Sequence, residues 1–285
     1  MLLAAIISKP QKPELSTIVP ELLQWLADHD YAAVLDPDSA GYVNGGSGVA
    51  RVDLPQHQPN LVIVLGGDGT LLAASRAFAR TMTPILSVNL GALGFLTEIP
   101  LSDLYGTLQA WCENSAVIDM REMMHAEHRR GDELLHEWEA LNDVVVAKGT
   151  IARMADFTVE IDSQLVATFR ADGIIISTPT GSTAYNLAAN GPIVMPSISA
   201  TVVTPICPHL LTLRPIVVPS TSTVCVHVVG VPNETYLTVD GQEAVRVELG
   251  DHVQCRKSEY SVRLLRHQPN GLFNVLRSKL KWGVR

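Results

Sequence analysis

The chain has 285 residues, of which 47% are hydrophobic, so it can bury a large core without disulfides or a structural metal. This length exceeds that of one typical domain and favours two domains. The formal net charge of −8 counts against a nucleic-acid partner and against binding to an anionic membrane surface. An anionic substrate would therefore have to be held locally, by backbone dipoles, by a few Arg or Lys side chains, or by a metal ion.

The sequence also argues against membrane insertion and metal ligation by the chain. No apolar run approaches the ~20 residues of a membrane span, and the apolar start at residues 1–10 fits a buried strand better than a signal peptide. The four cysteines show neither a zinc pattern nor a disulfide spacing. We expect a soluble, cytoplasmic protein that has no membrane partner and no metal site built from its own side chains.

The first third of the chain alternates strand-like and helix-like segments. Short apolar runs at 2–7, 32–36, 61–65 and 84–91 predict strands. The segments 17–30 and 70–79 lie between such runs and have the pattern of helices. Strands that alternate with helices form parallel βαβ units, so this part should be a doubly wound, Rossmann-like α/β domain.

The pattern changes after Ile99. A helix is expected over residues 102–114, followed by alternating β-branched segments, and from Ile216 onward strands and turns predominate. Hairpin turns are expected at Asn233, Asp240–Gly241 and Gly250–Asp251.

The predicted fold is therefore α/β plus β. An N-terminal α/β domain should cover residues 1–98, and a C-terminal β-rich domain should cover residues 99–270. The tail at 271–285 changes pattern again and is a candidate to pack back on the first domain.

A glycine-rich turn, Gly66-Gly67-Asp68-Gly69-Thr70, joins the predicted strand at 61–65 to the following helix. Glycines let a phosphate approach bare backbone, and the helix directs free N–H groups at the turn. Thr70 is placed to cap that helix. An aspartate repels phosphates, so Asp68 suits a phosphotransferase in which it accepts a proton or coordinates Mg²⁺. The alternative is a plain turn in which Asp68 caps the helix.

Two later motifs could hold a polar ligand. Asn142-Asp143 precedes a β-branched strand, where an amide and a carboxylate can accept hydrogen bonds from sugar hydroxyls; ordinary turn chemistry is the alternative. The segment 169–192 carries a Ser/Thr-rich loop in which Tyr185 could cover a planar base, and Asp172 precedes that loop. The alternative for this segment is a loop that caps the next helix.

Four charged or titratable residues are weaker candidates. Lys148 and Arg170 could contact phosphates, and His209 and Arg214 lie in a Pro-flanked segment near the loop. A single histidine is more often structural than catalytic. Asp240–Gly241 is most simply a hairpin turn.

The order of these motifs resembles that of the NAD kinases. The order is GGDGT, Asn-Asp before a strand, TPTGSTAYNLAA followed by Gly191-Pro192, CPH and RPIV around His209 and Arg214, and VDGQ at the Asp240 turn. GGDGT alone also looks like the turn of diacylglycerol and sphingosine kinases and of phosphofructokinases, whereas the TPTGSTAY block is far more specific. The resemblance implies transfer of the γ-phosphoryl group of ATP to the 2′-hydroxyl of the adenosine ribose of NAD, which gives NADP.

The resemblance implies roles for individual residues. Asp68 matches the aspartate that acts as general base on the 2′-hydroxyl. Asn142 and Asp143 match the pair that binds NAD, and Arg170 lies where it could meet the diphosphate. The remaining matches frame the phosphates or contact NAD, and they are Gly66, Gly67, Gly69, Thr70, Asp172, Thr183, Ala184 and Tyr185.

The resemblance also implies that the active site lies between the two domains, as in the family. It further implies a cofactor and an oligomeric state. Mg²⁺ or another divalent cation would accompany ATP, and the protein would form a homodimer or homotetramer in which one subunit's β-domain contributes to a neighbour's site. The sequence does not decide whether polyphosphate replaces ATP, whether NADH is accepted, or which dinucleotide inhibits by feedback.

Two positions depart from the family's common pattern. Many members have Asn-Glu where this chain has Asn142-Asp143, which shortens the carboxylate's reach by about one methylene. Many have Gly-Gly-Pro where this chain has Asn190-Gly191-Pro192. Asn tolerates a left-handed backbone, so we expect the turn to survive.

Two rival functions remain. A lipid or sphingoid kinase would share the glycine turn but leaves TPTGSTAY unexplained. A non-catalytic NAD-sensing module would bind NAD without turning over ATP and would have no use for Asp68.

Overall fold

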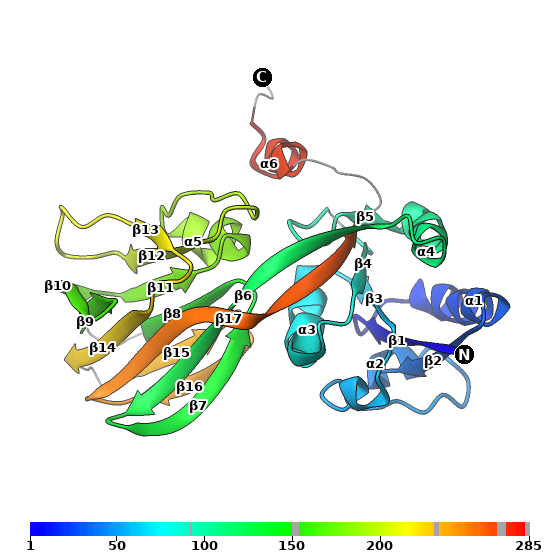
Figure 1. Ribbon diagram of the computed structural model, residues 1–285, viewed down its shortest axis with the longest axis horizontal. Helices are drawn as coiled ribbons and strands as arrows, with labels where there is room; N and C mark the ends of the chain where they lie inside the picture. Colours follow the sequence, from blue (N-terminus) through cyan, green and yellow to red (C-terminus); the bar gives the residue numbers. More distant parts are fainter. Residues whose placement is uncertain (92, 150–153, 231–233, 267–271, 283–285) are drawn as a thin grey trace. The chain divides into compact units, whose positions relative to one another are not determined.

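The computed structural model describes residues 1–91, 93–149, 154–230, 234–266 and 272–282, and its contacts divide the chain into two units. Unit 1 comprises Met1–Met120 and Val262–Arg285, and unit 2 comprises Arg121–Ser261 (Figure 1). These boundaries differ from residue 98, where the sequence pattern changes. The helix Leu104–Cys112 remains in unit 1 because its buried Leu104 and Leu108 belong to the core of that unit.

Unit 1 is built on a parallel sheet. Its strands are β1 (Leu2–Ser8), β2 (Tyr31–Leu35), β3 (Leu61–Gly66), β4 (Ile85–Asn89) and β5 (Ile99–Pro100). They lie in the order β2-β1-β3-β4-β5, and each neighbouring pair is parallel. The expected βαβ arrangement is confirmed.

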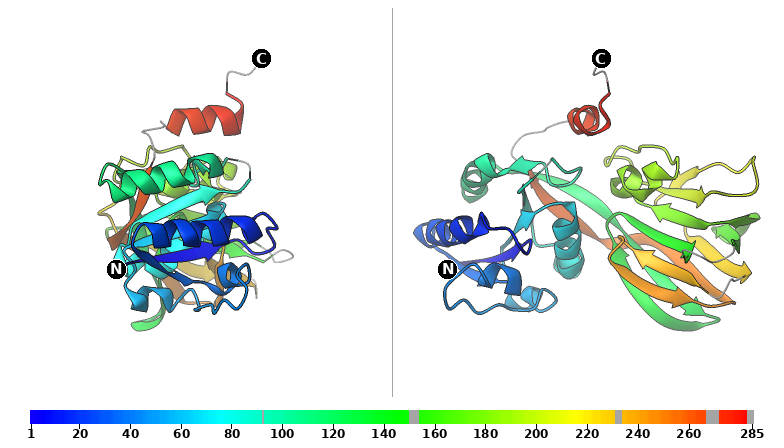
Figure 2. Two further views of the ribbon diagram at one scale, coloured as in Figure 1. Left: turned by 90° about the vertical axis from the view of Figure 1, so that its right-hand side faces the viewer. Right: turned by 180° about the vertical axis from the view of Figure 1, so that it is seen from behind.

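Helices cover both faces of this sheet. They are α1 (Leu15–Asp28), α2 (Pro37–Ala40), α3 (Asp68–Phe78) and α4 (Leu104–Cys112). The apolar stripes of α1 and α4 pack on alternate residues of β1, β3 and β4. α3 packs against β3 from the other side of the sheet (Figure 2). The carboxyl end of β3 therefore leads directly into the amino end of α3, where the glycine turn lies.

Unit 2 consists of two packed antiparallel sheets. One has the order β13-β12-β11-β8-β15-β16, and the other runs β10-β9-β14-β17, with β6 pairing β17 and β7. Their bounds are β6 (Val117–Arg130), β7 (Glu133–Ala140), β8 (Asp143–Lys148), β9 (Ala155–Ile161), β10 (Gln164–Ala171), β11 (Gly173–Ser177), β12 (Ala200–Ile206), β13 (Ile216–Pro219), β14 (Val224–Gly230), β15 (Thr235–Val239), β16 (Glu243–Val247) and β17 (Asp251–Arg266).

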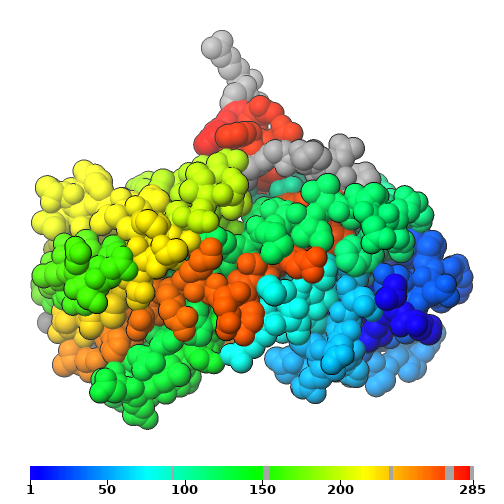
Figure 3. Space-filling view, viewed as in Figure 1, coloured from blue at the N-terminus to red at the C-terminus, as the bar shows by residue number. Residues whose placement is uncertain are grey.

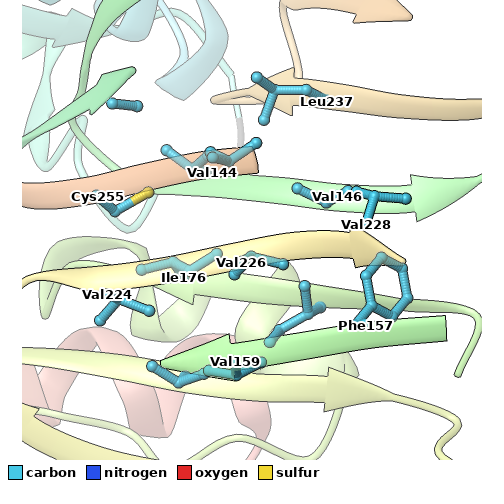
Figure 4. Close-up of a cluster of buried hydrophobic side chains, with 14 of the residues drawn as sticks. Val144, Val146, Phe157, Val159, Ile176, Val224, Val226, Val228, Leu237 and Cys255 are labelled. Atoms are coloured by element: carbon cyan, nitrogen blue, oxygen red, sulfur yellow. The ribbon is translucent and has the colours of Figure 1, made fainter. Parts of the chain in front are cut away.

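The core of unit 2 lies between these two sheets. Alternate residues of β8 and β11 face alternate residues of β9 and β14 across it, so Val144, Val146 and Ile176 meet Phe157 and Val226 (Figure 4). This is the alternation that a two-sheet sandwich requires. The β-rich character predicted for this part of the chain is confirmed.

The turns expected from the sequence do not all form as predicted. Asp240 and Gly241 have φ of +51° and +63° and form the β15–β16 hairpin turn, as predicted. Gly250–Asp251 is not a hairpin turn, because β16 and β17 belong to different sheets. Asn190 has a φ of +64°, so it does adopt the left-handed backbone expected for it. Asn233 lies outside the described residues.

The tail contains one helix, α6 (Leu272–Leu280), which belongs to unit 1. Val275 and Leu276 are buried, and Lys279 Nζ lies 6.0 Å from the centre of the Phe95 ring. Residues 271 and 283–285 of the tail lie outside the described residues.

Candidate functional site

The glycine turn ends β3 and begins α3. Gly67 is the residue before the helix, with extended φ and ψ, and Asp68 is the first helical residue. A Cβ at Gly66 would lie 2.4 Å from Thr70 Oγ1, so no side chain fits there. A Cβ at Gly67 would meet nothing within 4 Å, which leaves the backbone open to an approaching group. Thr70 lies within the first turn, so its expected capping role is wrong.

The Asp68 carboxylate is held by a second turn of unit 1. Oδ2 accepts a hydrogen bond from Phe95 N at 2.9 Å. Oδ1 accepts from Leu96 N at 3.2 Å, and from both the N and the Oγ1 of Thr97 at 2.9 Å. Asp68 makes no capping hydrogen bond within α3, so the interpretation of Asp68 as a mere helix cap is wrong.

Gly94 allows this turn to approach Asp68. A Cβ at Gly94 would lie 2.1 Å from Asp68 Oδ1 and 2.3 Å from Thr97 Oγ1. These contacts are far too short for any residue other than glycine. Neither Gly94 nor Thr97 is among the site residues predicted from the sequence, although a Gly-x-x-Thr segment directly after a predicted strand could have signalled a second polar turn at the same edge of the sheet.

In unit 2, Asn142 and Asp143 form a turn whose backbone is fixed by Asp240. The Asp240 carboxylate accepts hydrogen bonds from the amides of Leu141 at 3.0 Å, Asn142 at 2.7 Å and Asp143 at 3.1 Å. Three successive amides directed at one anion form a nest. Asp240 is thus more than the hairpin residue that its sequence indicates, because it also shapes the Asn-Asp turn.

Asp143 is a buried carboxyl group with only 4% of its surface exposed. Burial and the adjacent charge of Asp240 raise its pKa to about 7, although a backbone hydrogen bond from Tyr185 acts in the opposite direction. Asp143 therefore changes charge near neutral pH. A protonated carboxyl group can donate a hydrogen bond as well as accept one.

The TPTGSTAY loop packs directly on the Asn-Asp turn. Thr178 N and Oγ1 donate to the carbonyl oxygens of Asn142 and Leu141, at 2.9 and 2.6 Å. A Cβ at Gly181 would lie 2.0 Å from the Asn142 carbonyl oxygen, so this glycine is required for the contact. The chain then passes through a 3₁₀ turn, Thr180–Thr183, into α5 (Tyr185–Ala188). Asn142, Asp143 and Thr183–Tyr185 are thus brought together within unit 2.

Two features of this cluster point to a ligand. Asn142 Oδ1 is buried and has no hydrogen-bond partner among the described residues, although buried polar atoms are normally paired. Tyr185 is 47% exposed and borders a cavity of about 580 Å³, lined mainly by apolar side chains of α5 and of residues 205–215. Leu210 and Leu211 of this lining are 47% and 85% exposed. In Figure 3 the yellow part of the chain lies at the surface of unit 2.

Asp172 and Arg170 lie apart from this cluster. Asp143 pairs with Ser177 at one end of β11, whereas Asp172 precedes Gly173 at the other end, five residues and roughly 17 Å away at the strand's rise per residue. Asp172 pairs with Lys148 at 3.1 Å, and Arg170 pairs with Asp156 through two hydrogen bonds at 2.8 and 3.0 Å. Within one chain, the side chains of Asp172 and Arg170 therefore each form an ion pair with another residue of unit 2.

The two weaker candidates also have structural contacts. His209 donates its backbone N–H to the Arg170 carbonyl at 2.9 Å. Arg214 donates to the carbonyls of Leu211 and Leu213 at 2.6 and 2.8 Å, and it lines the cavity beside Tyr185.

Two family models match the chain: the ATP-NAD kinase N-terminal domain over residues 4–116 and the ATP-NAD kinase C-terminal domain over residues 141–267. The NAD kinase of Acidobacterium capsulatum is 59% identical over 281 residues, which cover 99% of each chain. The NAD kinase of Koribacter versatilis is 49% identical and covers 99% of this chain and 98% of its own.

Solved structures share the fold. The yeast NADH kinase complexed with NADH has a TM-score of 0.90 at 24% identity, with 100% of this chain and 89% of the other covered. An NAD kinase from Archaeoglobus fulgidus in complex with ATP has a TM-score of 0.77 at 23% identity, with 98% and 99% covered.

The glycine turn, the two-unit fold and these matches define the chain as a kinase, a phosphoryl-transferring enzyme. Over nearly its whole length, it belongs to the NAD kinase family. No helix among the described residues is long and apolar enough to cross a bilayer.

Proposed function

We propose that this protein transfers the γ-phosphoryl group of ATP to the 2′-hydroxyl of the adenosine ribose of NAD. The observation that carries the proposal is the 59% identity to an NAD kinase over 281 residues, in a chain whose Asp68 turn is intact. Unit 1 carries the glycine turn with Asp68, and unit 2 carries the Asn142–Asp143 turn with the Thr183–Tyr185 segment.

The residues of unit 1 suit phosphoryl transfer. The amides at the start of α3 and the open backbone of Gly67 provide donors for phosphate oxygens, and the positive end of the helix dipole supports them. The Asp68 carboxylate accepts the proton of the attacking hydroxyl. General-base help of this kind is worth roughly 10²–10⁴ in rate.

The residues of unit 2 suit recognition of the acceptor. Asn142 Oδ1 needs a donor, and a ribose hydroxyl or an adenine amino group can supply one. Asp143 can bond to a second hydroxyl, and the exposed ring of Tyr185 can stack on a planar base. Asp240 and the TPTGSTAY loop fix the backbone of the Asn142–Asp143 turn in advance.

We propose that a divalent cation enters with ATP rather than through a site of the protein. Among the described residues, no three His, Cys, Asp or Glu side chains gather as a metal site. Mg²⁺ usually keeps several waters and is held in part by substrate phosphates, so it can arrive bound to ATP and leave Asp68 to act as the base. The ion would neutralise charge on the phosphates during transfer.

One assay separates this proposal from the rival functions. The purified protein is incubated with Mg-ATP and NAD, and NADP is read out by an NADP-specific dehydrogenase; diacylglycerol replaces NAD as the control acceptor. We expect NADP to form and the lipid to remain unphosphorylated. Lipid phosphorylation would identify a lipid kinase, whereas NAD binding without any ATP turnover would identify a sensing module.

Asp68→Asn tests the general base. We expect kcat to fall by roughly 10²–10⁴ while the Kd for NAD stays within about twofold. Because an Asn amide would oppose the N–H of Phe95, the melting temperature of the variant must be measured as well. Near-full activity of Asp68→Asn would rule out the base assignment, and the assay with NAD and diacylglycerol would still identify the substrate.

A further inference from the structure

We propose that Thr97 is a positioning residue that turns the Asp68 carboxylate so that Oδ2, and not Oδ1, accepts the proton from the acceptor hydroxyl. The inference rests on the proposed function, because it needs Asp68 to be the base. It adds which oxygen reacts and which residue outside the GGDGT turn sets its direction.

The number of donors at each oxygen distinguishes the two atoms. A carboxylate has about four lone-pair sites, two on each oxygen. Oδ1 already faces three donors, namely Leu96 N at 3.2 Å and Thr97 N and Oγ1 at 2.9 Å. Among the residues that the structure describes, Oδ2 faces one donor, Phe95 N at 2.9 Å, so it retains a lone pair for a further hydroxyl.

The space around Oδ1 also favours Oδ2 as the oxygen that accepts the proton. An added Cβ at Gly94 would lie only 2.1 Å from Oδ1 and 2.8 Å from the carboxyl carbon. The chain itself therefore closes this side of the carboxylate, and a ribose hydroxyl cannot approach there. Asp68 as a whole is half-buried, which leaves its other side accessible.

Thr97 is the residue of this turn best placed to fix the carboxylate. Its side chain is fully buried, and it supplies two of the four hydrogen bonds, one through its backbone and one through its hydroxyl. The hydroxyl bond is the only one of the four that a substitution can remove while all the backbone donors stay in place. A charge-assisted bond of this kind is among the stronger hydrogen bonds in a protein, so its loss should free the carboxylate to rotate.

The test compares three variants of the full-length protein. Thr97→Val keeps the shape and removes the hydroxyl, Thr97→Ser restores the hydroxyl, and Thr107→Val is the matched control. Thr107 is equally buried in unit 1, and its hydroxyl bonds to the Asp103 carbonyl at 2.8 Å, within the first turn of α4. Steady-state kcat and the KM values for NAD and ATP are measured for each, together with the melting temperature.

We expect Thr97→Val to lower kcat roughly ten- to a hundredfold, because a small misplacement of a catalytic group costs about that much, and to change both KM values less than about twofold. Thr97→Ser should return kcat to within about threefold of the parent protein, and Thr107→Val should leave it unchanged. If Thr97→Val fails to fold, Thr97→Ala removes the same hydroxyl without requiring the methyl groups to fit.

Three outcomes would overturn the inference. They are an unchanged kcat in Thr97→Val, a loss that Thr97→Ser does not recover, and an equal loss in Thr107→Val that follows the melting temperature. Its failure is distinguishable from that of the proposed function. An inactive Asp68→Asn beside a fully active Thr97→Val leaves the base in place and refutes only the positioning role, whereas an active Asp68→Asn refutes the base itself.

Discussion

Carboxylates of similar appearance in the sequence have different environments in this fold. Asp68 accepts four hydrogen bonds and stays half-buried, and Asp240 accepts three amides from the turn that it shapes. Asp251 is fully buried against Arg130 and His128, and hydrogen bonds from these partners hold its pKa at about 2 despite the opposing effect of burial. Asp143 has the opposite shift, because it is buried beside another negative charge.

The raised pKa of Asp143 makes a prediction about stability. Its pKa is about 7 when folded and about 4 when unfolded, so the folded state binds the proton more tightly. The stability that this proton contributes is present below pH 4 and is lost as the pH rises to 7. Asp143→Asn keeps the acceptor for the Tyr185 amide and should therefore be the more stable protein at pH 8, by up to about 4 kcal/mol.

Urea unfolding of both proteins at pH 5 and pH 8 measures this difference. The advantage of Asp143→Asn should shrink at pH 5. Asp132→Asn, at an exposed position in the β6–β7 turn, controls for the loss of one negative charge. Equal destabilisation by Asp143→Asn at both pH values would contradict the expected titration of the buried carboxyl group.

At the scale of elements, two long strands run from one unit into the other. β6 and β17 each begin in one unit and end in the other, with the boundaries at 120/121 and 261/262. Near its end, β17 lies beside β4 at Leu264, and the Arg266 side chain is buried in unit 1. Its guanidinium pairs with Glu98 at 2.5 Å and Asp119 at 2.9 Å. These ion pairs attach the returning strand to the segments before and after α4.

Replacement of Arg266 should destabilise unit 1. Arg266→Leu would remove the Arg266 cation from Glu98, which is 9% exposed, and removing one partner of a buried pair is costly. We expect a loss of about 2–4 kcal/mol in the free energy of unfolding. Arg263→Leu on the same strand is the control, because the described part of the chain gives Arg263 no ion pair.

Chemical denaturation measures both changes. Adding Glu98→Gln to Arg266→Leu should recover part of the loss, since the unpaired buried charge is then removed. Identical stabilities for the Arg266 and Arg263 variants would show that the ion pairs contribute nothing beyond the side chain's packing.

For the molecule as a whole, the separation of Asp172 from Asp143 along β11 has a consequence for assembly. The resemblance implies that both contact NAD, yet they lie at opposite ends of one strand. A homo-oligomer in which unit 2 of one subunit supplies Asp172 to a neighbour's site would reconcile that expectation with their separation. We therefore expect sedimentation to give at least twice the mass of one chain.

Subunit complementation tests the shared site directly. Asp68→Asn and Asp172→Asn should each have low activity. When the two are mixed, dissociated and reassembled, a mixed dimer has one site with both aspartates intact, so about a quarter of all sites should recover activity. A mixture no more active than its components would mean that each site is completed within a single chain.

Some parts of the site can be predicted from the sequence, and others cannot. The turn from β3 to α3 follows from local pattern, because an apolar run, glycines and a helical repeat are neighbours in the chain. Gly94 and Thr97 follow a predicted strand and can be recognised as a polar turn, but no local pattern shows that this turn holds Asp68, which lies almost thirty positions earlier in the chain. Asp240 looks like a turn residue alone for the same reason, since its three amide partners lie about a hundred positions away.

The sequence by itself determined the class of each element, the presence of an α/β part and a β-rich part, and the family, because periodicity and motif order are properties of the chain. Only the tertiary structure decided that α4 and the end of β17 belong to unit 1, and that residues 95–97 hold the carboxylate of Asp68, with three of the four hydrogen bonds at Oδ1. Hydrogen bonds and ion pairs between distant positions depend on which strand ends meet, and sequence spacing does not specify that.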